Sequence, residues 1–152
     1  MLVEGKNLTT IWMDYNEGLI KIIDQRLLPH KLKIINLNSL SDAVYAIKEM
    51  QVRGAPLIGV TAAYGMYLAS KNNADIESLF ESGEKLKNTR PTAVNLSWAV
   101  DSIMKQIKEI DKNNRSEIIL QLATKIREED IVACSNIGDN GLELLESIYS
   151  KK

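Results

Sequence analysis

Two short segments each place an arginine just before a proline, which makes them the strongest candidates for a functional site in this sequence. In "VRGAP" Arg53 shortly precedes Pro56, and in "NTRPT" Arg90 directly precedes Pro91. Proline is favoured in the first turn of a helix, because its fixed φ suits the helix and its missing N–H removes no intrahelical bond. The spacing therefore predicts that each arginine lies at the start of a helix.

A helix start beside an arginine is suited to binding an anion. The unpaired N–H groups of the first turn carry about half a positive charge, and a guanidinium group adds donors that match phosphate oxygens. Gly54 has no side chain, so an oxyanion can approach the N–H groups of Gly54 and Ala55 closely. The predicted phosphate-binding residues are Arg53, Gly54, Ala55 and Arg90.

An alternative interpretation of the two segments stays open. Arg-Gly-x-Pro can simply mark a loop, with the arginine in a surface ion pair that contributes little. The repetition of the pattern puts anion binding on an equal footing with this alternative and no higher, because many helices begin with proline.

The other reactive residue types give weaker candidates. His30, the single histidine, follows Pro29 and has no evident carboxylate to orient it, so we expect it to be structural or solvent-exposed. Cys134 lies in an apolar helical stretch without a nearby cation, and we expect a buried, unreactive thiol. The sequence has no clustered metal-ligand spacing and no Walker or dinucleotide glycine loop.

Length and composition indicate one folded domain. The chain has 152 residues, of which 45% are hydrophobic and 26% charged, with a net charge of −1. With a pI near 5.9 it has no basic surface typical of proteins that bind nucleic acids or anionic membranes. The single cysteine forms no internal disulfide, and the amino terminus lacks the pattern of a secretion signal, so we expect a cytoplasmic protein.

The predicted secondary structure around the two arginines falls into two parts. Residues 1–38 have strand character, with β-branched, partly alternating runs that predict a small antiparallel meander. From Ser39 onward the apolar period becomes helical, and residues 39–152 predict a helical bundle. The predicted strands are 8–12, 19–24 and 31–37, and the predicted helices are 39–50, one from Pro56, 74–89, 91–110, and one or two over 115–149. The expected fold class is α+β, mostly α, with a three-stranded antiparallel sheet before the bundle.

Apolar positions predict which face of each helix is buried. The helix from Pro56 is apolar all round and contains Gly59 and Gly65, so we expect it at the centre of the bundle with another backbone packed closely against it. The other predicted inward-facing residues are Leu40, Val44, Ile47 and Met50; Ala93, Leu96, Val100, Ile103, Ile107 and Ile110; and Leu122, Ile126, Ala133, Ile137, Leu144 and Ile148.

Four segments together resemble the amino-terminal domain of the methylthioribose-1-phosphate isomerase family. They are "DQRLLP" (24–29), "AIKEMQVRGAPLIGVTAAYG" (46–65), "TRPTAVNLSWA" (89–99) and "CSNIGDNGLELL" (134–145). The "RGAP" segment alone is shared with ribose-1,5-bisphosphate isomerases and, more loosely, with the regulatory subunits of translation initiation factor 2B. The first and third segments favour the methylthioribose family.

The resemblance implies an aldose–ketose isomerisation in methionine salvage, without a metal or organic cofactor. It assigns the substrate-phosphate contacts to Arg53, Gly54, Ala55 and Arg90, and makes Asn95 a candidate for ordering the second loop. It places the catalytic cysteine and aspartate in a carboxy-terminal Rossmann-like domain that this chain does not contain, so we expect Cys134 to have no catalytic role and the chain alone to be inactive.

The partners expected from this resemblance are a sugar phosphate and either a second copy of the chain or the carboxy-terminal domain. The alternative is a non-enzymatic regulatory or interaction module related to the initiation-factor subunits, in which the bundle docks against another chain.

Overall fold

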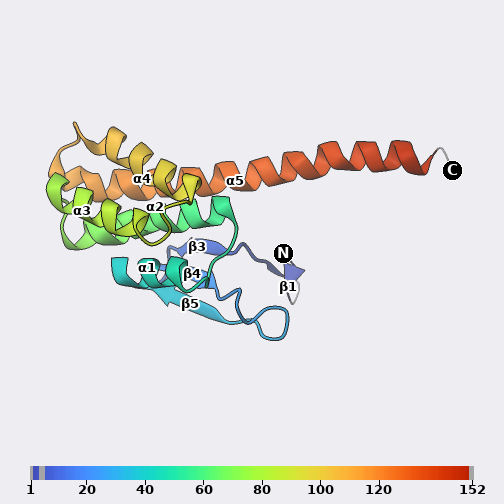
Figure 1. Ribbon diagram of the computed structural model, residues 1–152, viewed down its shortest axis with the longest axis horizontal. Coiled ribbons are helices and arrows are strands. Elements are labelled where there is room, and N and C mark those ends of the chain that lie inside the picture. Colours follow the sequence, from blue (N-terminus) through green and yellow to red (C-terminus); the bar gives the residue numbers. More distant parts are fainter. Residues whose placement is uncertain (1, 4–5, 151–152) are drawn as a thin grey trace.

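A small sheet lies against a bundle of helices in the computed structural model, which describes residues 2–3 and 6–150 (Figure 1). The strands are β1 (Leu2–Val3), β2 (Lys6–Asn7), β3 (Ile11–Asp14), β4 (Leu19–Ile23) and β5 (Ile34–Leu37). The helices are α1 (Leu40–Lys48), α2 (Ala55–Asn72), α3 (Ile76–Lys87), α4 (Val94–Ile107) and α5 (Lys112–Tyr149). The predicted fold class, α+β and mostly α, is confirmed. The extreme ends of the predicted meander and bundle, residues 1 and 151–152, lie outside the described residues, as do residues 4–5.

The sheet is antiparallel with the strand order β3-β4-β5, as the meander predicts. Ile20 pairs with Leu37 and Ile22 pairs with Ile11, and these four side chains are buried. The first strand lies later than the predicted 8–12, because the ladder continues to Asp14. The short β1–β2 hairpin was not predicted from the sequence.

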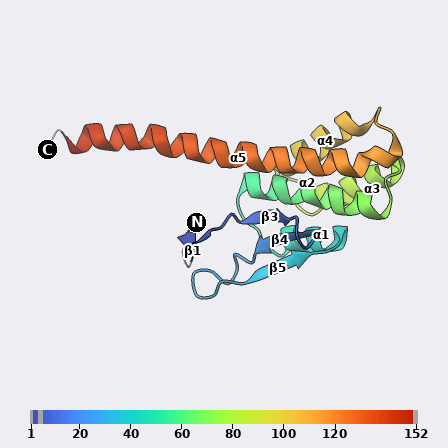
Figure 2. The same ribbon diagram turned by 180° about the vertical axis from the view of Figure 1, so that it is seen from behind.

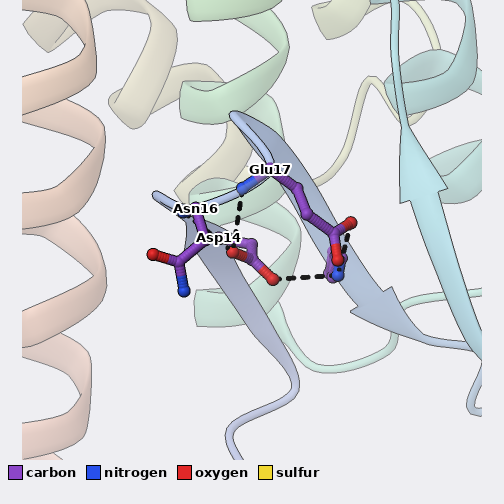
Figure 3. Close-up of polar contacts among 4 residues, drawn as sticks. Asp14, Asn16 and Glu17 are labelled. Carbon is purple, nitrogen blue, oxygen red and sulfur yellow. Dashed lines mark hydrogen bonds and ion pairs between the residues drawn. The ribbon is translucent and has the colours of Figure 1, made fainter.

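The turn between β3 and β4 is closed by one carboxylate (Figure 3). Asp14 Oδ1 accepts the N–H groups of Asn16 (3.0 Å) and Glu17 (3.2 Å), and its Oδ2 accepts from Lys21 Nζ (2.9 Å). Gly18 has a φ of 68°, which a glycine adopts without steric cost. The hydrogen bond from Lys21 is the largest cause that lowers the pKa of Asp14. The predicted turn is therefore held by local polar contacts.

Helix α2 is the centre of the bundle, packed against the other four helices. Its residues from Leu57 to Ser70 are all buried. A Cβ atom built on Gly59 would lie 2.8 Å from the backbone oxygen of Asn95 in α4, and one on Gly65 would lie 3.1 Å from Ala43 Cβ. The predicted close approach of another backbone is confirmed at Gly59, whereas a side chain fills the space at Gly65.

The buried faces of the flanking helices agree only in part with the apolar spacing. In α4 the predicted seam is confirmed for the four residues Leu96, Val100, Ile103 and Ile107. In α1 the prediction is confirmed for Ile47, and Leu40 and Val44 are partly buried against the core. The other buried residues are Ala43 and Ala46, because α2 approaches closely on the side of the small residues. Met50 is exposed, since the helix has already ended and this residue has a φ of 57°.

Helix α5 is a single helix whose first half packs on the bundle and whose second half extends beyond it (Figures 1 and 2). Ile119 and Ala123 are buried, and the Arg127 guanidinium group donates to the Ile11 carbonyl (2.8 Å) and to Thr9 Oγ1 (2.9 Å), which ties the helix to the sheet. The inward orientation predicted for Ala133, Ile137, Leu144 and Ile148 is wrong for this structure, in which these residues are exposed. The buried environment predicted for Cys134 is wrong for the same reason.

Among residues 2–3 and 6–150, no helix combines the length and the apolar character that crossing a membrane requires.

Candidate anion-binding site

Helices α2 and α4 run in the same direction, so that their amino ends lie at the same end of the bundle (Figure 1). Gly59, in the second turn of α2, packs on Asn95 in the first turn of α4. Farther along, a Cβ atom built on Gly83 of α3 would lie 2.8 Å from Val100 Cγ1 of α4 and 3.7 Å from Met66 Sδ of α2. The two predicted helix starts are therefore brought together by packing of the helices behind them.

The start of α2 leaves backbone donors open. Gly54 is the N-cap with a φ of 98°, and it offers no side chain to cap the helix. The first intrahelical bond runs from Ile58 N–H to the Gly54 carbonyl (3.0 Å), and the N–H groups of Gly54 and Ala55 have no hydrogen-bond partner within the described part of the chain. Gly54 and Ala55 are exposed. The helix begins at Ala55, one residue before the predicted Pro56.

The start of α4 differs from the prediction. The helix begins at Val94 rather than Pro91, and Arg90 lies in a turn in which the Ala93 N–H donates to the Arg90 carbonyl (2.9 Å). Pro91 occupies the second position of this turn, where its fixed φ is equally suited. Arg90 is therefore separated from the first residue of α4, Val94, by this turn and does not adjoin the helix. The Asn95 side chain makes no hydrogen bond to a described residue, so Asn95 contributes through its backbone packing on Gly59.

Both helix starts lack the acidic or hydroxyl residues found at the N-cap positions of the other helices. Ser39 caps α1 and Asp111 caps α5 through side-chain hydrogen bonds, whereas α3 has Asp75 at its N-cap position without such a bond and Glu77 in its first turn. The N-caps of α2 and α4 are glycine and alanine, and neither first turn contains an acidic residue. Since unpaired N–H groups at a helix start favour an acceptor, both starts are suited to an anion from outside the chain.

The arginines divide into a structural set and an unengaged pair. Of the chain's five arginines, Arg26 binds Asp24, Arg115 donates to the Ile110 and Ala74 carbonyls, and Arg127 binds the sheet. Within residues 2–3 and 6–150, no hydrogen bond or ion pair engages the guanidinium group of Arg53 or Arg90. Arg53 is exposed and Arg90 is half-buried. The two arginines selected from the sequence are therefore those whose donors remain available.

A pocket of about 270 Å³ lies beside the two helix starts. Its apolar lining includes Val60 and Ile126, and Trp98 forms one wall. Glu129 and Asp130 of α5 line another wall, and their negative charges disfavour a phosphate group inside the pocket itself. An anion is therefore expected at the exposed loop of Arg53 rather than in this pocket.

The loop that carries Arg53 is held by the segment after β4. Gln25 Oε1 accepts the Arg53 N–H (2.7 Å), and the Gln25 N–H donates to the Gln51 carbonyl (2.9 Å). The neighbouring Asp24 is buried and accepts two hydrogen bonds from the Arg26 guanidinium group (2.9 and 2.7 Å), which most strongly lowers the pKa of Asp24. The sequence points to these residues only through the family resemblance. The local signal for their ion pair is an acidic residue followed two positions later by an arginine, next to a buried strand.

The other candidates do not join this site. His30 is exposed, as one of its two predicted environments allows. Among the residues that the structure describes, no group of three or more histidine, cysteine, aspartate or glutamate side chains could hold a metal ion. A groove of about 600 Å³ between α3 and α4 is lined by Ile76, Phe80 and Met104 with four charged side chains, and none of the predicted site residues contributes to it.

The sequence matches a known family over most of its helical part. Residues 51–149, which run from the Arg53 loop to the end of α5, match the Initiation factor 2 subunit family. The chain belongs to this family.

Curated relatives named methylthioribose-1-phosphate isomerase match along the whole chain. Those of Rhizobium meliloti and Methylocella silvestris are 41% and 46% identical over all 152 residues, which correspond to 42% of each relative. A putative methylthioribose-1-phosphate isomerase of Methanocaldococcus jannaschii is 50% identical over 90% of this chain and 38% of its own length. The chain thus spans about two fifths of the length of these relatives.

Two solved structures share the fold. A 5-methylthioribose 1-phosphate isomerase from Pyrococcus horikoshii has a TM-score of 0.74 and 34% identity, covering 82% of this chain and 37% of that one. The delta subunit of translation initiation factor eIF-2B from A. fulgidus has a TM-score of 0.71 and 36% identity, covering 82% of this chain and 38% of that one. Two of the three branches named by the sequence resemblance, the methylthioribose isomerases and the initiation-factor subunits, are therefore represented.

Proposed function

We propose that this chain supplies the phosphate-binding part of an aldose–ketose isomerase that converts 5-methylthioribose 1-phosphate to 5-methylthioribulose 1-phosphate. The observation that carries the proposal is that two uncapped helix starts lie at the same end of the bundle, each preceded by an arginine that has no partner among the described residues. The names of the relatives that match the whole chain support the choice of substrate.

Each proposed residue has a distinct role toward the phosphate. The N–H groups of Gly54 and Ala55 donate to phosphate oxygens from the start of α2, and the Arg53 guanidinium group adds a fork of charged donors. Arg90 approaches from the turn before α4. Hydrogen bonds to a charged group contribute about 1.5 to 3 kcal/mol each, so this set is sufficient to hold a monophosphate at useful affinity.

The isomerisation itself requires groups that move a hydrogen between the first two sugar carbons, and the proposed site is made of donors alone. We therefore expect the catalytic cysteine and aspartate to lie in the carboxy-terminal domain that the resemblance implies. Incubation of the 152-residue chain with 5-methylthioribose 1-phosphate is expected to give binding without turnover. Turnover at a rate near that of the relatives would refute this division of roles.

Replacing either arginine is expected to weaken phosphate binding. Arg53→Ala and Arg90→Ala should each raise the dissociation constant for the sugar phosphate about tenfold, since each removes charge-assisted hydrogen bonds. Isothermal titration calorimetry measures this change. Lys108→Ala, which removes an exposed cation just past the far end of α4, is the control for net charge and should bind as the wild type does. Equal affinity of all four proteins would contradict the proposed site.

A second candidate function is a regulatory or interaction module, as in the initiation-factor branch of the family. The observation that favours it is the outer half of α5, which extends beyond the bundle (Figure 2). Apolar side chains on this half are exposed. These side chains include Ile137, Leu144, Leu145 and Ile148. An interaction module of this kind has no physical need for two unengaged arginines beside uncapped helix starts. Failure of the wild-type chain to bind phosphate or the sugar phosphate would favour this second function.

A further inference from the structure

We propose that Gln25 is a positioning residue for the phosphate-binding loop, acting through the Arg53 backbone rather than on the ligand. The inference rests on the proposed function of Arg53, Gly54 and Ala55. It gives the "DQRLLP" segment a role in ligand binding.

The loop between α1 and α2 needs support from outside itself. Helix α1 ends at a reversal in which Met50 has a φ of 57° and the Gln51 N–H bonds back to the Ala46 carbonyl (2.9 Å). Val52 is fully buried, whereas Arg53 and Gly54 are exposed. The exposed part of the loop therefore has no hydrophobic anchor between Val52 and α2.

Gln25 supplies this support through two hydrogen bonds to alternate residues of the loop. Its backbone N–H donates to the Gln51 carbonyl (2.9 Å), and its side-chain Oε1 accepts the Arg53 N–H (2.7 Å). Because the Arg53 N–H is occupied, the peptide plane before Arg53 is fixed. The donors that remain open are the next two N–H groups, those of Gly54 and Ala55.

Gln25 is itself held in place by its neighbours. The Asp24 N–H donates to the Lys33 carbonyl (2.9 Å), and the buried Asp24 carboxylate binds Arg26 and accepts weakly from Gln51 Nε2 (3.4 Å). The Gln25 backbone therefore lies between the end of the sheet and the loop. Through these hydrogen bonds, the loop before α2 is held in a fixed position relative to the sheet.

A glutamine suits this position better than a glutamate would. A carboxylate oxygen can accept the same Arg53 N–H, but it would place a negative charge one residue from the open donors of the loop and repel a phosphate. A leucine has nearly the same size and accepts nothing. The two substitutions therefore separate loop geometry from loop charge.

The experiment compares the isotopically labelled wild-type chain with Gln25→Leu, Gln25→Glu and the control Gln121→Leu by NMR. Gln121 is exposed on α5, and its amide donates only to Glu117 among the described residues. Amide hydrogen exchange of Arg53 reports the positioning contact without any ligand. Titration with inorganic phosphate, followed at the Gly54 and Ala55 amides, reports binding.

We expect Gln25→Leu to expose the Arg53 amide to exchange and to weaken phosphate binding about fivefold, as for the loss of one hydrogen bond. Gln25→Glu should keep the Arg53 amide protected yet bind phosphate more weakly, with the difference from wild type shrinking as salt screens the new charge. The control should match the wild type in both measurements.

Two contrary results are distinguishable. If the wild type binds phosphate and Gln25→Leu binds it equally well, Gln25 does not position the loop and this inference is overturned. If phosphate does not shift the NMR signals of the Gly54 and Ala55 amides in the wild type, both the proposed function and this inference are refuted.

Discussion

Gly59→Val is expected to destabilise the protein by about 3 kcal/mol, at the upper end of the usual cost of overpacking a core. A Cβ atom at this position would lie 2.8 Å from the backbone oxygen of Asn95, so that α4 must move away from α2 to make room. Backbone atoms in a packed helix cannot turn aside as a flexible side chain can. Urea unfolding followed by circular dichroism measures the loss.

Gly138→Ala is the matched control for this substitution. Gly138 also lies in a helix, but a Cβ atom there would meet nothing within 4 Å. Alanine has the higher helix propensity by about 1 kcal/mol, so the variant should unfold at the same or a higher urea concentration. A Gly59→Val variant as stable as the wild type would show that α2 and α4 are not in close contact.

Asp24→Asn is expected to lower the free energy of unfolding by about 3 kcal/mol at neutral pH. Breaking a buried ion pair costs about 3 to 5 kcal/mol, and the lower figure applies because the Arg26 side chain is 35% exposed and can be hydrated. The variant also loses the charge that organises the backbone around Gln25. The measurement is urea unfolding at pH 7.

The pH dependence of this effect has a defined sign. The Arg26 guanidinium group holds the pKa of the folded Asp24 carboxyl below its ordinary value. The ionised Asp24 carboxyl therefore contributes its full stabilisation above the pKa of about 3.9 that it has in the unfolded chain. This contribution is lost as the pH falls through the lower pKa of the folded state. The stability difference between wild type and Asp24→Asn should be constant from neutral pH to about pH 5 and should narrow only below about pH 4.

Asp75→Asn provides the control for an exposed ion pair. Asp75 lies 2.8 Å from Lys112, and both side chains are more than half exposed. Exposed pairs contribute about 0 to 1 kcal/mol, and asparagine is as good an N-cap as aspartate, so stability should be almost unchanged. If Asp24→Asn and Asp75→Asn lowered the free energy of unfolding equally, burial of Asp24 would not strengthen its ion pair.

The sequence was sufficient to predict the centre of the fold. A helix that is apolar on every side and contains glycines is stable in a soluble protein only when other helices surround it, and α2 lies in such a position. The meander and the seam of α4 follow from periods of two and about three and a half residues. These predictions succeeded because they depend on local pattern and on burial, which the residue types encode directly.

Other features could not be predicted from local pattern alone. The outer half of α5 has the same apolar spacing as the inner half, and spacing alone cannot tell whether a surface exists to cover it. Pro91 fits both a turn and a helix start, so the boundary of α4 was misplaced. The contact between Gln25 and Arg53 joins residues 28 positions apart, and no local pattern indicates it.

Helix α2 is buried on all sides after its exposed first turn, so ligand binding at that turn is linked to the stability of the whole domain. This helix cannot fray or tilt without disturbing every neighbour that packs on it. A ligand held there would raise the midpoint of thermal denaturation of the entire domain, in proportion to the logarithm of its concentration once the site is nearly saturated. A thermal denaturation curve would therefore report occupancy of this site without an enzymatic assay.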